Sequence, residues 1–272
     1  MLNLDLILAE RRRDTGMNLI DLPIAVLDSG VGGISVLREL VRVMPNEHFL
    51  YFGDSKNAPY GEKTPEEVLH ITRENLKALL ARGIKALVLA CNTATGSAAR
   101  TLRAEYPELI LIGIEPALKP ASLLGDRPRV LVMATPLTLR QEKFCALMGR
   151  FSETSEILPL PCAGLVELIE DGKLCGEELD AYLKNLLSPH QNTKIDAVVL
   201  GCTHYPHVKD QIAKHLPHGA VILDGGEGTA RETRRRLLEA DLLRTEGEGH
   251  VEILNSSNDE SRIALSQMLL NR

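Results

Sequence analysis

Two cysteines in this chain stand where an apolar segment gives way to polar residues. Cys91 lies in the stretch ALVLACNTATG, and Cys202 lies in the stretch AVVLGCTHYPH. A cysteine that follows a buried strand is usually a small hydrophobic residue of the core. Here, however, Asn-Thr follows the first thiol and Thr-His follows the second, and buried polar side chains need hydrogen-bond partners. We therefore expect both cysteines to line a cleft, in which a substrate supplies those partners.

Two thiols in such positions could carry out acid–base chemistry. A free thiol has a pKa of about 8.5, and a helix that follows it favours the thiolate through its free N–H groups and its dipole. Modest local help would then give a base that works near neutral pH. One thiol alone suggests a nucleophile. Two thiols that face each other across a cleft can remove a proton from one face of a carbon and donate one to the other face, which predicts a racemase or an epimerase.

Metal binding and redox chemistry are the alternative uses of these thiols. Four side chains of the right type could ligate zinc: Cys91, Cys202, His204 and His207. No Cys-x-x-Cys or His-x-x-x-His spacing supports a zinc site or a redox disulfide between the two thiols. The other three cysteines lack a matching strand context, and we expect them to be structural: Cys145, Cys162 and Cys175.

Apolar runs alternate with helix-like segments along the chain, which is the pattern of an α/β fold with a mostly parallel sheet. Strands are predicted at 23–27, 48–52, 86–90, 109–114, 129–133, 197–200 and 220–223. Helices are predicted at 64–81, where Thr64-Pro65 resembles a helix start, and at 176–187.

A weak internal repeat links the two cysteine segments. Both match as Ala-x-Val-Leu-small-Cys, and a strand that ends in a polar turn precedes each of them. The spacing from Asp28 to Cys91 is close to the spacing from Thr135 to Cys202. The repeat predicts two related α/β domains, each with a cysteine at the carboxyl end of a strand, where open α/β sheets bind ligands. Chance similarity of two buried strands is the alternative.

The residues that follow the first predicted strand allow two other interpretations. Asp28 could be the N-cap of a helix at 34–44, a role that is compatible with a place in the cleft. Gly30, Gly32 and Gly33 superficially resemble a phosphate-binding loop. The sequence lacks both the full GxGxxG spacing and the later acidic residue that binds ribose, so it gives a nucleotide site little support.

Composition excludes several classes of protein. The chain has 272 residues, 44% of them hydrophobic and 25% charged, as in ordinary globular proteins. The net charge of −6 argues against a nucleic-acid surface. No run of apolar residues is long enough to span a membrane, and the first residues lack the features of a signal peptide. The five scattered cysteines suit a reducing compartment, so we expect a cytoplasmic protein.

Five motifs extend the argument beyond the two cysteines. They are DSGVGG at 28–33, GDSKNAPYGEK at 53–63, ACNTAT at 90–95, ATPLT at 134–138 and GCTHYP at 201–206. With these motifs in this order, residues 23–231 resemble the glutamate racemases, the cofactor-independent members of the aspartate/glutamate racemase superfamily. The resemblance implies interconversion of L- and D-glutamate with no cofactor or metal, which supplies D-glutamate for bacterial peptidoglycan. GCTHYP favours glutamate racemases over aspartate racemases.

The same resemblance assigns roles to individual residues. Cys91 and Cys202 correspond to the two catalytic acid/base thiols, which Asp28 and His204 respectively assist. Glu170 aligns with a glutamate near the second thiol, and Glu167 is the neighbouring candidate for that role. The residues implied to bind the substrate are Asp28, Ser29, Tyr60, Gly61, Asn92, Thr93, Thr135, Thr138, Thr203 and His204.

The resemblance also implies two similar α/β domains related by a pseudo-twofold axis, with the active site in the cleft between them. Residues 1–20 would form an extension, 21–114 with 226–272 the first domain, and 115–225 the second domain. The chain would cross between the domains near Glu115-Pro116 and again near Asp224-Gly225. Gly225 departs from the family, which usually has a serine there, and residues 240–272 match poorly.

Partners and rival functions follow from the same comparison. We expect glutamate as the substrate and a homodimer as the oligomeric state. We also expect activation by a peptidoglycan precursor, with the N-terminal extension as the effector site. Neither nucleic acid nor a membrane is expected as a partner. Another racemase of the superfamily, such as an aspartate racemase, is the rival enzyme. A catalytically silent protein that holds a small carboxylate in the cleft is the rival from a different class.

Overall fold

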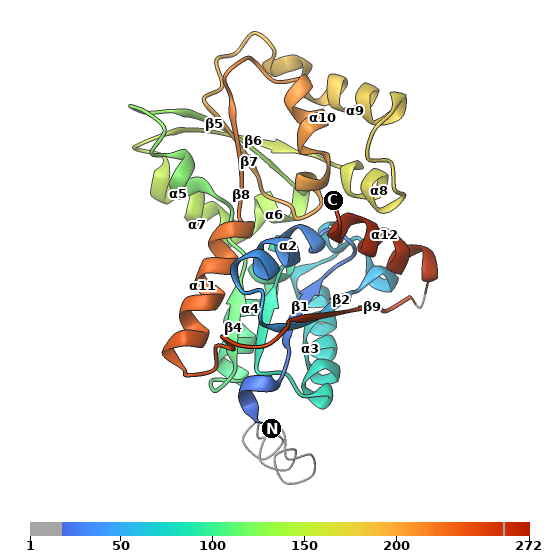
Figure 1. The fold of residues 1–272 in the computed structure, drawn as a ribbon. Coiled ribbons are helices and arrows are strands. Elements are labelled where there is room, and N and C mark those ends of the chain that lie inside the picture. The colour runs from blue at the N-terminus through green and yellow to red at the C-terminus, as the bar shows by residue number, and fades with distance from the viewer. Residues whose placement is uncertain (1–17, 258) are drawn as a thin grey trace.

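The computed structural model describes residues 18–257 and 259–272. They form two units, each built around a parallel sheet, and one unit lies above the other in Figure 1. The first sheet contains β1 (Ile24–Asp28), β2 (His48–Gly53), β3 (Ala86–Leu89), β4 (Ile110–Gly113) and β9 (His250–Asn255). The second sheet contains β5 (Arg129–Ala134), β6 (Glu156–Pro161), β7 (Ala197–Leu200) and β8 (Val221–Asp224).

The two sheets share one strand order. The first runs β4-β3-β1-β2-β9 and the second, read from its other edge, runs β8-β7-β5-β6, with every pair parallel. β1 and β5 therefore occupy equivalent places, as do β3 and β7, the strands that precede Cys91 and Cys202. The predicted fold class, two similar α/β units with mostly parallel sheets, is confirmed.

Helices cover both faces of each sheet. In the first unit they are α2 (Ile34–Val43), α3 (Pro65–Arg82), α4 (Asn92–Glu105), α11 (Gly226–Glu239) and α12 (Glu260–Leu270). In the second they are α5 (Leu118–Ala121), α6 (Pro136–Arg140), α7 (Glu142–Phe151), α8 (Leu165–Glu170), α9 (Glu177–Leu187) and α10 (Lys209–Lys214). Single 3₁₀ turns occur at Leu19–Asp21, Ser55–Asn57, Tyr60–Glu62, Ser188–His190 and Tyr205–Val208.

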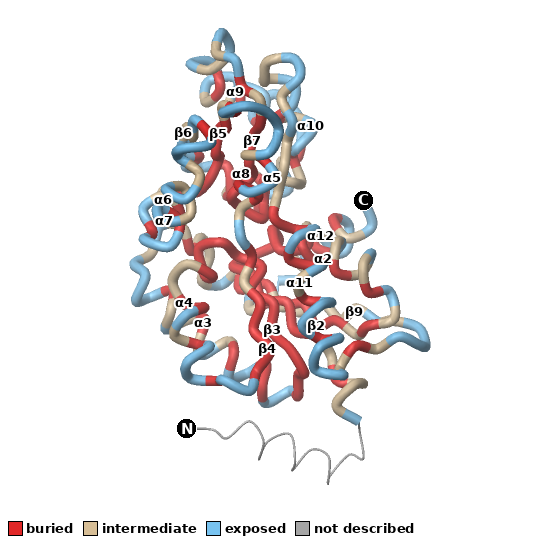
Figure 2. Tube along the Cα trace, turned by 90° about the vertical axis from the view of Figure 1, so that its left-hand side faces the viewer, coloured by how far each residue is buried: buried red, intermediate tan, exposed pale blue. Residues whose placement is uncertain are grey.

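Alternating side chains of the strands build the core on both faces of each sheet. In β1, Ile24 and Val26 pack with α2, whereas Ala25 and Leu27 pack with α3 and α4. Strands buried on both faces read as continuous apolar runs, as β1, β3 and β7 do. Figure 2 shows the buried strands β3 and β7 inside their units, with exposed residues on the surrounding helices.

The structure contains each of the seven predicted strands to within one residue at either end. The predicted helix at 64–81 is α3. It begins with a capping box in which the Thr64 side chain accepts from the Glu67 N–H and the Glu67 carboxylate accepts from the Thr64 N–H.

Two strands, β6 and β9, were not predicted. β6 has the sequence EILPLP, and its two prolines are tolerated because it lies at the edge of the sheet. β9 is also an edge strand, and it returns the C-terminal part of the chain to β2 of the first sheet.

The predicted domain boundaries remain a prediction, since the sheets show only which strands pair. The two predicted crossovers lie against each other: a Cβ atom on Gly225 would be 2.3 Å from the carbonyl oxygen of Glu115. That contact gives a reason for glycine where the family usually has serine. Most of the predicted N-terminal extension, residues 1–17, lies outside the described residues. In the described part of the chain, no helix is long and apolar enough to cross a membrane.

A buried ion pair anchors the end of the first sheet that lies away from the second unit. Lys85 Nζ lies 2.6 Å from Glu47 Oε2, and the two side chains are 1% and 0% exposed. Lys85 also donates to the carbonyl oxygens of Ile20 and Leu242, and Glu47 accepts from the Arg244 N–H. The pair therefore joins the segment before β1 and the segment after α11 to the sheet.

We expect Lys85→Met to lower the free energy of unfolding by about 3–5 kcal/mol, because it leaves the Glu47 carboxylate buried without a cation. Urea unfolding followed by circular dichroism measures the loss. Lys77→Met is the matched control, since its pair with Glu74 is exposed, and it should leave stability nearly unchanged. Equal losses in the two variants would contradict a special role for the buried pair.

Candidate active site

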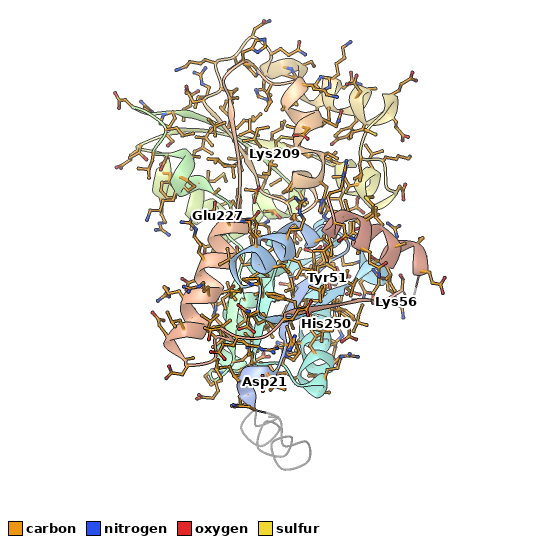
Figure 3. All side chains as sticks on the ribbon, in the orientation of Figure 1. Asp21, Tyr51, Lys56, Lys209, Glu227 and His250 are labelled. Carbon is orange, nitrogen blue, oxygen red and sulfur yellow. The ribbon has the colours of Figure 1, made fainter. Side chains whose placement is uncertain are left out.

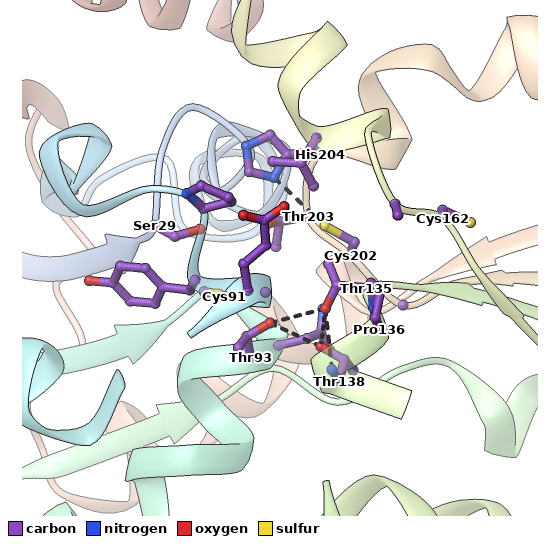
Figure 4. Close-up of a pocket in the computed structure, with 18 of the residues that line it drawn as sticks. Ser29, Cys91, Thr93, Thr135, Pro136, Thr138, Cys162, Cys202, Thr203 and His204 are labelled. Atoms are coloured by element: carbon purple, nitrogen blue, oxygen red, sulfur yellow. Dashed lines mark hydrogen bonds between the residues drawn. The ribbon is translucent and has the colours of Figure 1, made fainter. Parts of the chain in front are cut away.

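A small cavity lies between the two units, at the carboxyl ends of their strands (Figure 4). Most of the predicted site residues line it: Ser29, Tyr60, Gly61, Cys91, Asn92, Thr93, Thr135, Thr138, Cys202, Thr203 and His204. The other two, Asp28 and Glu170, are buried and contact residues of this lining. The structure thus brings together residues that are distant in sequence and come from both units.

Cys91 ends the loop after β3 and is the N-cap of α4. Its Sγ accepts a hydrogen bond from the Ala94 N–H at 3.4 Å. A helix follows this thiol. The pKa of Cys91 is nevertheless raised, not lowered as the sequence analysis expected for a thiol before a helix. Burial raises the pKa of Cys91 to about 12, and the nearby Asp28 carboxylate adds to the effect. The protonated thiol is therefore the favoured form of Cys91 near neutral pH.

No α-helix follows Cys202 directly, so the condition under which a helix would favour a thiolate is not met at the second thiol. A turn leads instead into the 3₁₀ turn at Tyr205–Val208 and then into α10. The partner of this thiol is a side chain: His204 Nδ1 lies 3.7 Å from Cys202 Sγ. An imidazole thus occupies the position that backbone N–H groups occupy at Cys91.

His204 is held by a buried carboxylate. Its Nε2 lies 2.6 Å from Glu170 Oε1. Burial lowers the pKa of His204, but the contacts with Cys202 and Glu170 outweigh burial and raise that pKa well above its usual value. Burial likewise opposes ionisation of Glu170, yet the hydrogen bond to His204 gives Glu170 a lowered pKa. An imidazolium–carboxylate pair therefore lies behind the second thiol.

Of the two candidate glutamates, Glu170 is the one that contacts His204. Glu167 instead lines the cavity, where its Oε2 is buried and has no hydrogen-bond partner among the described residues. The auxiliary role in catalysis remains a prediction for Glu170.

Asp28 lies at the end of β1 and connects the two units. Its Oδ1 accepts from the Gly30 N–H at 3.1 Å, and its Oδ2 accepts from the Thr203 hydroxyl at 3.0 Å. Burial raises the pKa of Asp28. The alternative that Asp28 is the N-cap of α2 is wrong, because Gly33 occupies that position.

Three hydroxyl groups form a cluster on the other side of the cavity. Thr93 Oγ1 lies 3.0 Å from Thr138 Oγ1 and 3.4 Å from Thr135 Oγ1, and Thr135 Oγ1 lies 2.9 Å from Thr138 Oγ1. Thr93 belongs to α4, whereas the other two belong to the second unit, so hydroxyl groups from both units meet here. Tyr60 lines the same cavity, but its hydroxyl donates to Asp54 at 2.6 Å.

Two glycines between β1 and α2 allow the second unit to approach closely. A Cβ atom on Gly30 would lie 1.9 Å from Glu170 Oε1, and one on Gly32 would lie 2.4 Å from His204 Nδ1. The Val31 N–H between them donates to Glu170 Oε1 at 2.7 Å. The glycines that resembled a phosphate loop therefore make room for the histidine and the glutamate of the other unit.

The comparison with known proteins agrees with this geometry. The model of the Asp/Glu/Hydantoin racemase family matches residues 24–233. Among curated relatives, the glutamate racemase of Clostridium botulinum is 50% identical over 91% of this chain and 96% of its own length. That of Clostridium kluyveri is also 50% identical, over 93% and 99%.

The chain belongs to the Asp/Glu/Hydantoin racemase family.

It is thus an amino-acid racemase, and solved structures of glutamate racemases share its fold. The Francisella tularensis enzyme in complex with D-glutamate superposes with a TM-score of 0.81 at 28% identity, covering 93% of this chain and 95% of that one. The Escherichia coli enzyme in complex with L-glutamate and the activator UDP-MurNAc-Ala gives 0.79 at 30% identity, covering 91% and 95%.

Some residues in or next to this cavity were missed in the sequence analysis. Cys162 was predicted to lack a strand context, but it directly follows β6 and lines the cavity. The prolines of β6 obscured that strand. Cys145 and Cys175 are exposed. Arg262 contacts Glu170 from α12, 92 positions away, and no local pattern predicts that contact.

The zinc alternative finds no geometric support in residues 18–257 and 259–272, where no three His, Cys, Asp or Glu side chains are grouped as metal ligands. His207, one of the four proposed ligands, does not line the cavity, and its Nε2 lies 3.1 Å from the carbonyl oxygen of Gly32. Burial lowers the pKa of His207 to about 4, so this imidazole is neutral near pH 7.

Gly32→Ala should reduce kcat/KM on the order of 100-fold, because the new methyl group displaces the His204 ring and small misplacements of catalytic groups cost about that much. Steady-state racemisation kinetics measure the effect. Gly228→Ala is the control: it lies in α11 with open space around the added Cβ, so activity should stay within about twofold while helix propensity improves. Full activity in Gly32→Ala would contradict the close approach described here.

Proposed function

We propose that this protein is a glutamate racemase that interconverts L- and D-glutamate by direct proton transfer between the α-carbon and two thiols. The observation that carries the proposal is that Cys91 and Cys202 follow equivalent strands of two similar sheets and line one cavity from opposite units. A carbon held between them would present one face to each thiol. The names of the curated relatives and the D- and L-glutamate in the solved neighbours support glutamate as the substrate.

The environments of the two thiols suggest which one removes a proton and which one donates a proton in each direction. In one direction the Cys202 thiolate, beside the His204 imidazolium, removes the α-proton, and the protonated Cys91 thiol donates a proton to the opposite face. The reverse direction uses the same groups with their roles exchanged, and Asp28 lies near Cys91 to assist it. The energetic requirement is to stabilise the carbanion-like transition state, which preorganised hydrogen-bond donors in a buried site do well.

The polar groups of the cavity suit an amino acid with two carboxylates and one ammonium group. No lysine or arginine occurs among the described residues that line the cavity, so neutral donors, together with the His204 ring, would hold the carboxylates. Asn92 and Thr203 offer donors and acceptors close to the thiols, and the Thr93–Thr135–Thr138 cluster offers hydroxyl groups. In this proposal the two thiols remove and return the α-proton without a cofactor.

The wider biological setting is part of the proposal. D-glutamate made in the cytoplasm would supply peptidoglycan synthesis. The Escherichia coli neighbour was solved with UDP-MurNAc-Ala as activator, and we propose a similar peptidoglycan precursor as an effector of this protein. A homodimer, and a first domain formed by 21–114 with 226–272 around a second domain at 115–225, complete the proposed organisation.

Replacement of either catalytic cysteine by serine should reduce racemisation by at least about 100-fold, because a serine hydroxyl is a far weaker acid and base at neutral pH than a thiol. The remaining thiol should still remove a proton from one face. Elimination of HCl from 3-chloroglutamate reports that half-reaction: a thiolate takes the α-proton, chloride leaves Cβ, and the enamine product hydrolyses to 2-oxoglutarate and ammonium. Cys91→Ser and Cys202→Ser should each retain elimination with one enantiomer, and not the same one.

The double variant should eliminate HCl from neither enantiomer, and melting temperatures control for folding. If both folded single variants preferred the same enantiomer, the two-thiol mechanism would be wrong. Parallel losses on both enantiomers would instead point to a packing role for the cysteines.

A further inference from the structure

A side chain from the C-terminal helix reaches the carboxylate behind the second thiol. Arg262 Nη1 on α12 lies 2.9 Å from Glu170 Oε2 and also donates to the backbone carbonyl of Glu170. The Arg262 side chain is 26% exposed and that of Glu170 is 8% exposed, so the contact is shielded from water on its Glu170 side. The second carboxylate near this guanidinium is Asp171, 3.9 Å from Nη2 and mostly exposed.

Arg262 completes the set of donors around Glu170. Oε1 accepts from the Val31 N–H at 2.7 Å and faces His204 Nε2 at 2.6 Å, while Oε2 faces Arg262. A carboxylate held from three directions has one orientation, and charge-assisted bonds are the stronger kind. The resulting chain of contacts runs from Arg262 through Glu170 and His204 to Cys202.

The position of Arg262 is fixed by packing that has no part in the chemistry. α12 lies against α2 at the boundary between the two units (Figure 1). Leu269 of this helix is fully buried in the core, and the Ser266 hydroxyl donates to the Arg262 carbonyl at 2.9 Å. The guanidinium therefore reaches Glu170 from a helix that lies beyond residues 24–233, the part of the chain that the family model matches.

We propose that Arg262 is a positioning residue for the second thiol: it holds the Glu170 carboxylate against His204 and so keeps the imidazole directed at Cys202. This inference rests on the proposed two-thiol mechanism. Its distinctive consequence is an effect on one direction of proton transfer, because the contacts of Cys91 with Ala94 and Asp28 do not involve Arg262.

The rival explanation is that Arg262 only fastens the two units together. Glu170 belongs to the second unit and α12 to the first, so the ion pair also bridges them. Loss of such a fastening would loosen the cavity as a whole, and both thiols would lose efficiency alike. The two explanations therefore differ in the ratio of the half-reactions rather than in total activity.

The test measures elimination of HCl from each enantiomer of 3-chloroglutamate by Arg262→Gln. We expect the enantiomer that Cys202→Ser fails to process to be eliminated at least about 10-fold more slowly, as befits a lost charge-assisted contact. The enantiomer that depends on Cys91 should change by less than about twofold. Arg262→Lys keeps the positive charge and should recover part of the lost rate.

Arg235→Gln is the matched control, since Arg235 pairs with Glu232 and Glu239 on an exposed face of α11, and it should alter neither half-reaction. Equal losses on both enantiomers in folded Arg262→Gln, or no loss at all, would overturn the proposal. The cysteine variants, assayed in parallel, keep the two ideas apart. If they lack opposite preferences, the two-thiol mechanism fails; if they show them while Arg262→Gln acts on both enantiomers alike, only the role of Arg262 fails.

Discussion

The hydrogen-bonded contact between Glu170 and His204 is the interaction on which the arrangement of the site depends. A charged pair at 8% and 2% exposure is tolerated only when its remaining polar atoms also find partners. Those partners come from outside the second unit: the Val31 N–H from the loop after β1, and Arg262 from α12. The pair therefore requires the two units to be in contact, and contact at this distance requires glycine at positions 30 and 32. The need to satisfy the buried Glu170–His204 pair thus explains both the close packing of the two units and the glycines at positions 30 and 32.

Similar sheets do not give similar thiols. β3 and β7 deliver Cys91 and Cys202 to equivalent positions, yet the first thiol faces backbone N–H groups and a buried aspartate, and the second faces an imidazole. Burial raises the pKa of Cys91, whereas the partner of Cys202 is the His204 ring, whose own pKa is raised by its contacts with Cys202 and Glu170. The proposed racemisation therefore uses two thiols with different neighbours, one on each side of the cavity. Tyr51, labelled in Figure 3, illustrates how the first unit stiffens its side of the site, since its buried hydroxyl donates to the Gly30 carbonyl at 2.6 Å.

Prediction from sequence succeeded where the pattern was local. Seven apolar runs gave seven strands, the Thr64 cap began α3, and the repeat around the two cysteines anticipated the shared strand order. It failed where the cause lay elsewhere in the molecule. The prolines of β6 are unfavourable in a central strand, but they are tolerated here because β6 lies at the edge of its sheet. A 3₁₀ turn, not an α-helix, is the first element after Cys202, and burial in the folded protein raises the pKa of Cys91. The contact of Arg262 with Glu170 could not be predicted from a local sequence pattern, because the two residues are 92 positions apart and only the fold brings them together.

The central claim is that two different groups serve the two faces of the α-carbon, and the fate of the α-hydrogen tests it most directly. L-glutamate is incubated with the enzyme in D₂O, the reaction is stopped early, and the α-position of both enantiomers is examined by NMR or mass spectrometry. Two thiols predict D-glutamate that carries deuterium at Cα almost completely, since the donating thiol has exchanged with solvent, while the remaining L-glutamate keeps its protium. D-glutamate that retains the original protium, or early deuterium in both enantiomers, would show one group serving both faces and would contradict the account.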